Sequence, residues 1–335
     1  MNATLRAFLA GLIDYAGLFP PASLGWEEAL RRYARARAGR DGWILGRFLA
    51  PAALLGEMEA PIRRAGFDRA TPLRLSAIAG AAEDEAGARA RLEEEGRTIR
   101  LLHEALGPDV AVEAIEAKLP ASLASSGDAG RIGSFVDFLR ELAAGACRGP
   151  SDIWIEVGAS PNWEIAAAAL IDQMRGSPSP GRSPSGRAGF KLRCGGAAPA
   201  VVPSTPTVAF AIASCRDAGV PIKCTAGLHH PARRAAGAAG GTDEHGFLSV
   251  FAAAIFAEAL GWPRDRIAEC VSETDARAFE FGGASLVWRE GSATESEIAG
   301  ARREFASGFG SCSFEEPRDD LAALGWMEPI EDGER

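Results

Sequence analysis

Short apolar runs alternate with longer segments of helical periodicity along most of the chain. Apolar residues recur every three or four positions over seven segments, which predicts helices at 26–38, 52–65, 84–106, 133–146, 163–175, 205–218 and 247–260. Between them lie runs with the length and composition of buried strands, at residues 12–16, 43–49, 73–78, 110–117, 153–157, 190–194 and 222–226. We expect an eighth strand within residues 278–287.

Strands that alternate with helices in this way form a parallel sheet with helical crossovers. The sheet either closes into a barrel or stays open, and no glycine-rich dinucleotide or phosphate-loop motif follows any strand to favour the open form. We therefore predict an α/β fold, a single (β/α)8 TIM barrel over residues 1–335. Two parts lie outside the repeat: a disordered, low-complexity insertion at 176–189 and a C-terminal helical extension from about 289 to 335.

The composition narrows the class of protein. The 335 residues are 47% hydrophobic and carry a formal net charge of −9, which argues against a nucleic-acid partner. No apolar run is long enough to cross a membrane, the N-terminal segment does not resemble a secretion signal, and the six cysteines form no CxxC pair. We expect a cytoplasmic protein with reduced thiols that acts on a small molecule, and barrels of this kind commonly form homo-oligomers.

Lysine is rare in this chain, and its placement is informative. Only three of the 36 basic residues are lysine, namely Lys118, Lys191 and Lys223, and each lies in or just after a predicted strand. An amine can lose its proton and attack a carbonyl carbon, whereas a guanidinium stays charged. Lys191 and Lys223 fall on neighbouring predicted strands, close enough for their amines to interact. The alternative is that each lysine only pairs with a buried carboxylate.

Several other ionisable residues interrupt apolar strands, which predicts a polar pocket inside the barrel. Lys191 and Arg193 share one face of their strand. Acidic candidates for moving protons are Glu113 and Glu116, with Glu156 on the next strand. Candidates for holding an anionic group bidentately are Arg193 together with Arg47 or Arg74.

The two lysine segments, Phe190-Lys191-Leu192-Arg193-Cys194-Gly195-Gly196 and Pro221-Ile222-Lys223-Cys224-Thr225-Ala226-Gly227, resemble class I aldolases of the deoxyribose-phosphate aldolase type. The resemblance implies that Lys191 forms a Schiff base, that Lys223 lowers the pKa of Lys191, and that Glu113 or Glu116 relays protons. It implies no cofactor. The family's Thr-Ser-Thr-Gly after the first lysine is Leu-Arg-Cys-Gly here, and Arg193 indicates a different grip on an anion.

Glycines and histidines complete the candidate site. Backbone amides at Gly195, Gly196 and Gly227, and at the pair Gly282 and Gly283, could approach an anionic group. His229 and His230 directly follow the seventh predicted strand, where they could bind substrate or exchange protons. A metal site would use His229 or His230 with His245 and Glu244, but no zinc-binding spacing supports one, and we assign no metal ligands.

The sequence therefore predicts carbon–carbon lyase chemistry on a small phosphorylated or carboxylated carbonyl compound, with Lys191 as the nucleophile. Three rivals use the same barrel: a metal-dependent lyase or hydrolase, a phosphate-binding barrel that transfers phosphoribosyl groups, and a non-catalytic protein whose lysines are merely ion-paired. The sequence does not name the substrate.

Overall fold

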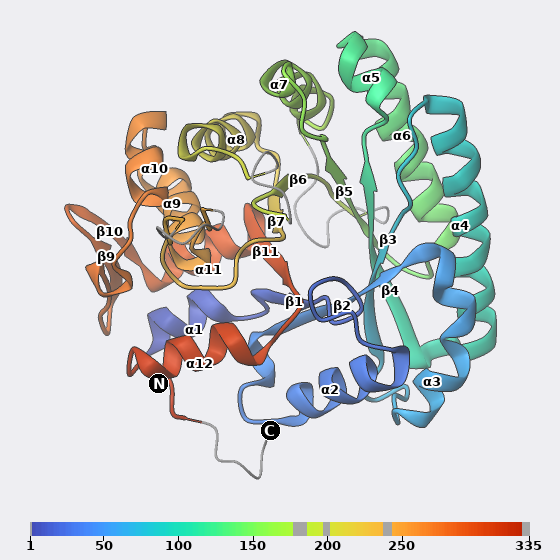
Figure 1. Ribbon diagram of the computed structural model, residues 1–335, viewed down its shortest axis with the longest axis horizontal. Coiled ribbons are helices and arrows are strands. Elements are labelled where there is room, and N and C mark those ends of the chain that lie inside the picture. Colours follow the sequence, from blue (N-terminus) through green and yellow to red (C-terminus); the bar gives the residue numbers. More distant parts are fainter. Residues whose placement is uncertain (1, 177–185, 197–201, 237–242, 330–335) are drawn as a thin grey trace.

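The computed structural model describes residues 2–176, 186–196, 202–236 and 243–329. Eight parallel strands close into a barrel in the order β1-β11-β7-β6-β5-β4-β3-β2 (Figure 1). These strands are β1 (Ile13–Tyr15), β2 (Leu45–Pro51), β3 (Leu73–Ile78), β4 (Val110–Lys118), β5 (Asp152–Glu156), β6 (Ala188–Arg193), β7 (Ile222–Thr225) and β11 (Ala306–Ser311). The predicted fold class, a (β/α)8 barrel, is confirmed.

Helices surround the barrel (Figure 1). They are α1 (Ala3–Leu9), α2 (Trp26–Ala38), α3 (Glu59–Arg64), α4 (Glu85–Leu106), α5 (Ala121–Ser126), α6 (Ala129–Ala146), α7 (Trp163–Gln173), α8 (Thr205–Ala218), α9 (Phe247–Leu260), α10 (Arg264–Val271), α11 (Glu295–Glu304) and α12 (Glu315–Ala323). Among the described residues, none of these helices is long and apolar enough to cross a membrane.

Local chemistry explains where several helices begin and end. The Asp84 side chain accepts a hydrogen bond from the Gly87 amide at the start of α4, and the helix ends where Gly107 takes a positive φ of 59°. The predicted helix at 52–65 is instead a 3-10 helix (Ala52–Glu57) followed by α3. The later start places Pro61 in the first turn of α3, where its missing N–H removes no helical hydrogen bond.

The eighth barrel strand is not the predicted one. Residues 278–287 contribute to a separate antiparallel sheet of β8 (Phe279–Phe281), β9 (Ser285–Trp288) and β10 (Gly291–Thr294). The strand that closes the barrel is β11, which pairs with β1 and β7 and lies inside the predicted C-terminal extension. A Cβ on Gly308 would lie 2.7 Å from the Leu12 carbonyl oxygen, so only glycine permits this close packing of β11 on the residue that precedes β1.

The predicted insertion at 176–189 falls mostly at 177–185, outside the described residues, while β6 already begins at Ala188. Arg187, which also falls within the predicted insertion, lies among the described residues. The Arg187 amide and guanidinium both donate to Asp152, at 3.0 to 3.3 Å, which fixes the start of β6 against the start of β5.

Candidate active site

Lys191 and Lys223 lie directly opposite each other on β6 and β7, and both side chains project into the barrel. Alternation along each strand places Lys191 and Arg193 on the interior side with Lys223 and Thr225 beside them. Lys223 is 1% exposed and Lys191 is 7% exposed. The sequence prediction that these two amines are neighbours agrees with this register.

Glu116 of β4 connects the two amines. Lys191 Nζ lies 2.8 Å from Glu116 Oε2, and Lys223 Nζ donates to the other oxygen, Glu116 Oε1. Ser76 on β3 also donates to Oε1, at 2.6 Å. Burial by itself would raise the pKa of Glu116, but the charges of Lys191 and Lys223 outweigh it and hold the pKa well below its ordinary value.

Two further carboxylates, Asp14 and Glu156, also contact the amines. Together with Lys191, Lys223, Arg193 and Glu116 they form a charged cluster that we call the upper layer. Asp14 of β1 accepts a hydrogen bond from Lys223 Nζ at 2.5 Å. Glu156 of β5 lies 3.7 Å from Lys191 Nζ and accepts a 2.8 Å hydrogen bond from Arg193 Nε. Burial lowers the pKa of Lys223, yet Asp14 and Glu116 raise it above its ordinary value overall, so Lys223 stays protonated at neutral pH.

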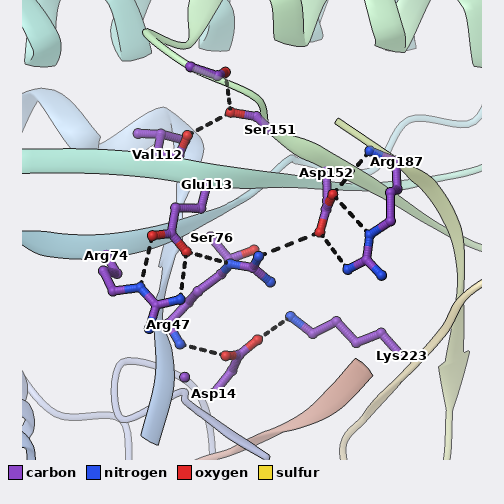
Figure 2. A network of polar contacts seen from close by, with 12 residues as sticks. Asp14, Arg47, Arg74, Ser76, Val112, Glu113, Ser151, Asp152, Arg187 and Lys223 are labelled. Carbon is purple, nitrogen blue, oxygen red and sulfur yellow. Dashed lines mark hydrogen bonds and ion pairs between the residues drawn. The ribbon is translucent and has the colours of Figure 1, made fainter. Parts of the chain in front are cut away.

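A second charged cluster, the lower layer, consists of Arg47, Arg74, Glu113 and Asp152 (Figure 2). It lies nearer the beginning of the strands, because Asp152 is the first residue of β5 and Arg74 the second of β3. Glu113 accepts hydrogen bonds from Arg74 at 2.8 and 3.0 Å and from Arg47 at 3.1 Å, and Arg47 also lies 3.5 Å from Asp152. Asp14 joins the two layers, because it accepts a 2.5 Å hydrogen bond from the Arg47 amide while it pairs with Lys223.

This arrangement separates the candidates that the sequence grouped together. Of the two predicted acidic residues, Glu116 contacts both amines, and Glu113 pairs with arginines instead. Arg47 and Arg74 are engaged in the lower layer and do not line the cavity above Lys191. The reason is their depth along the strands, since the active sites of such barrels lie where the strands end and Arg74 is only the second residue of β3.

A cavity of about 520 Å³ opens above Lys191 at the carboxyl ends of the strands. Lys191 and Arg193 line it, whereas Lys223 is buried and does not line it. Apolar side chains, including Phe19, Leu49 and Ile78, form part of its wall. The cavity thus offers one amine and one guanidinium to a small molecule.

Glycines after β6 and β7 let two backbone segments touch at this mouth. Gly195, Gly196 and Gly227 all line the cavity. A Cβ on Gly227 would lie 2.6 Å from the Gly195 Cα, and Gly227 has a positive φ of 67°. The other predicted pair, Gly282 and Gly283, lies in the turn between β8 and β9 and not at the cavity, because that segment belongs to the separate sheet.

We expect Gly227→Ala to lower the free energy of unfolding by about 3 kcal/mol, because it adds a backbone collision to a strained φ. The matched control is Gly219→Ala, where φ is +64° and a Cβ would meet nothing within 4 Å. That change should cost about 1 kcal/mol. Urea unfolding of both variants measures the difference, and equal losses would show that the contact with Gly195 carries no weight.

The histidines lie in different surroundings. His229 lines the cavity, and its Nδ1 is 3.1 Å from Glu316 Oε2. His230 lies outside this cavity, with Nδ1 2.7 Å from Asp320 Oδ2 and Nε2 3.9 Å from Glu244. His245 is buried and donates to the Pro203 carbonyl at 2.7 Å. Within the described ranges, no group of three or more His, Cys, Asp or Glu residues is arranged to hold a metal ion.

The sequence analysis did not assign Asp14 to the site. Its only signal was a single carboxylate between Ile13 and Tyr15 in an otherwise apolar strand. Its partner Lys223 is 209 residues away, so the pairing depends on the closure of the barrel. Cys312, which also lines the cavity, follows the strand that the sequence analysis had not recognised.

Comparisons with known proteins place this geometry in context. No protein-family model and no curated protein matches the chain. Two crystal structures described as a "putative deoxyribose-phosphate aldolase" from Toxoplasma gondii ME49 do match. One has 11% identity and a TM-score of 0.52 and covers 98% of this chain and 97% of its own. The other, the apo form, has 13% identity and a TM-score of 0.48, with 96% and 98% covered. The likeness to the structure with the TM-score of 0.52 agrees with the (β/α)8-barrel fold of this chain.

Proposed function

We propose that this chain is a class I aldolase-like carbon–carbon lyase that forms a Schiff base between Lys191 and a small phosphorylated or carboxylated carbonyl compound. The observation that carries the proposal is the pair of buried amines on β6 and β7, which one carboxylate bridges. Of these two lysines, Lys191 lines the cavity and Lys223 does not. The distant likeness in fold to structures described as aldolases agrees with it.

The balanced charges of the upper layer allow a proton to move from Lys191 to Glu116 and remain within the site. Three cations, Lys191, Lys223 and Arg193, stand against three carboxylates. These carboxylates are Asp14, Glu116 and Glu156. When Lys191 becomes a neutral nucleophile, its proton can pass to Glu116 at 2.8 Å, which keeps the total charge of the layer unchanged.

The chemistry then follows from the position of the amine. Lys191 Nζ attacks the carbonyl carbon. The carbonyl oxygen takes up two protons, one from the attacking amine and one from Glu116, and leaves as water, so that a positively charged iminium remains. This cation lies where the ammonium lay, so Glu116 and Glu156 stabilise it. The hydroxyl group on the departing carbon gives its proton to Glu116, that fragment leaves as a second carbonyl compound, and the iminium takes up the electron pair of the broken carbon–carbon bond to become an enamine. The proton returns to the enamine carbon, and addition of water to the resulting iminium releases the first carbonyl product and the amine.

The structure changes the role that we assign to Lys223. The sequence analysis gave it the task of lowering the pKa of Lys191. Lys223 lies closer to its two carboxylates, Asp14 and Glu116, than Lys191 does to Glu116 and Glu156. We propose that Lys223 positions Glu116, and that Arg193 at the cavity mouth holds the anionic group of the substrate.

Borohydride trapping tests the proposal directly. The protein is incubated with small aldehydes, ketones and sugar phosphates, reduced, digested and analysed by mass spectrometry. We expect a stable adduct on Lys191 that is absent from Lys191→Arg. Because the chain has only three lysines, Lys118→Arg serves as the control and should retain the adduct.

One rival has a specific observation in its favour. Both amines are ion-paired, as expected of a non-catalytic barrel whose lysines serve only the fold. Under that reading no carbonyl compound is trapped on Lys191, or Lys118 is labelled equally. Either result would overturn the lyase proposal.

A further inference from the structure

Cys312 and His229 lie at the mouth of the cavity, in the segments that follow the neighbouring strands β11 and β7. Gly310 pairs with Thr225 in the sheet, so the residues that follow these strands emerge side by side. Cys312 and His229 both line the cavity. The proposed lyase chemistry uses neither of them.

The imidazole is held by a carboxylate on its other side. His229 Nδ1 lies 3.1 Å from Glu316 Oε2, at the beginning of α12. A hydrogen bond with the Cys312 sulphur raises the pKa of His229 to about 9, Glu316 adds to this increase and burial opposes it. His229 is therefore an imidazolium at neutral pH, with the Cys312 sulphur and the Glu316 carboxylate as its neighbours.

The other cysteines differ in their surroundings. Cys194, Cys215, Cys224 and Cys270 are at most 2% exposed. Cys147 is half-buried like Cys312, but it lies at the end of α6, where burial raises the pKa of its thiol. Cys312 thus combines access from a cavity with a neighbouring imidazole and carboxylate.

We propose that Cys312 is a second reactive site of this chain, a nucleophilic thiol that His229 activates and that small carbon electrophiles entering the cavity modify. The sulphur supplies the electron pair of the new sulphur–carbon bond, and the leaving group departs with the pair of the bond that breaks. The thiol proton remains on His229, which Glu316 keeps oriented. The site does not depend on chemistry at Lys191.

Alkylation by iodoacetamide, in which iodide leaves, tests the proposal on the full chain. Labelling of each cysteine at pH 7 is followed over time by mass spectrometry. We expect Cys312 to react about tenfold faster than Cys147, and His229→Gln to slow Cys312 about tenfold while Cys147 keeps its rate. Glu316→Gln, which keeps the imidazole, should slow Cys312 by a smaller factor.

The internal control separates activation from unfolding. A variant that loosens the fold would accelerate labelling of Cys147 and of the four buried cysteines. If Cys312 reacts no faster than Cys147, or keeps its rate in a folded His229→Gln variant, the proposal is wrong. The readout requires no enzymatic activity, so it stands or fails separately from the lyase proposal.

Discussion

Glutamine in place of Glu116 is expected to lower the free energy of unfolding by about 3–5 kcal/mol, because it leaves two buried ammonium groups without their shared counter-charge. Urea unfolding at pH 7 measures this loss. The matched control is Glu94→Gln, which removes a carboxylate that is 67% exposed and pairs with Arg97 on the same helix. That change should cost less than about 0.5 kcal/mol.

The loss should also depend on pH. Lys191 and Lys223 outweigh burial and keep the pKa of Glu116 below its ordinary value of 4.5. A carboxyl group whose pKa is lowered by folding stabilises the protein above its unfolded pKa, and this contribution disappears as the pH falls below about 4.5. The native chain should therefore lose stability in acid more steeply than Glu116→Gln, and the two curves should converge.

A double variant identifies the cause of the loss. Glu116→Gln combined with Lys191→Met removes the cation that lies farther from its remaining carboxylate, while Glu156 keeps its hydrogen bond with Arg193, and should recover part of the stability of Glu116→Gln. If the double variant is less stable than Glu116→Gln by the full cost of a second independent change, unpaired charge is not the reason for the loss.

Asparagine in place of Asp152 is expected to cost about 3 kcal/mol, since this carboxylate faces Arg187 and Arg47 in the lower layer. Burial would raise the pKa of Asp152, but Arg187 and Arg47 outweigh burial and lower it. Urea unfolding measures the effect. Asp137→Asn, at a 69% exposed position paired with Arg140, should change stability little.

This variant also tests the separation between the two layers. If the lower layer only stabilises the barrel, folded Asp152→Asn should still form the borohydride adduct on Lys191. Loss of the adduct in a folded sample would place the lower layer in the reactive site, against the assignment made from its depth along the strands.

The pattern of the sequence predicted seven barrel strands because each is an apolar run between helices. The eighth was misplaced for a physical reason. Residues 279–288 are rich in aromatic and aliphatic residues and do form strands, but short antiparallel ones. The closing strand is Ala306-Ser307-Gly308-Phe309-Gly310-Ser311. Its glycines are required because a Cβ there would collide with Leu12 or Leu49, and such small residues do not have the composition typical of a strand.

The sequence predicted those residues of the candidate site whose type is rare in this chain. Lys191 and Lys223 stood out because arginine replaces lysine almost everywhere else. Arg47 and Arg74 looked equally suitable, because the sequence shows that a strand contains a charge but not how deep in the barrel the charge lies. That depth depends on the register between strands, including the irregularity between Leu75 and Ser76 in the pairing of β3 with β4.

The pairing of β1 with β11 has a consequence for how the chain folds. Ile13 pairs with Phe309, so β1 must wait for a strand that is synthesised almost 300 residues later. Until β11 is synthesised, β1 and β7 each have an open edge on the side that β11 will occupy. No strand then connects β1, which carries Asp14, to β7, which carries Lys223. Contacts between such distant residues form slowly, so we expect the synthesis of β11, rather than the formation of the early helices, to set when Lys223 gains its contact with Asp14.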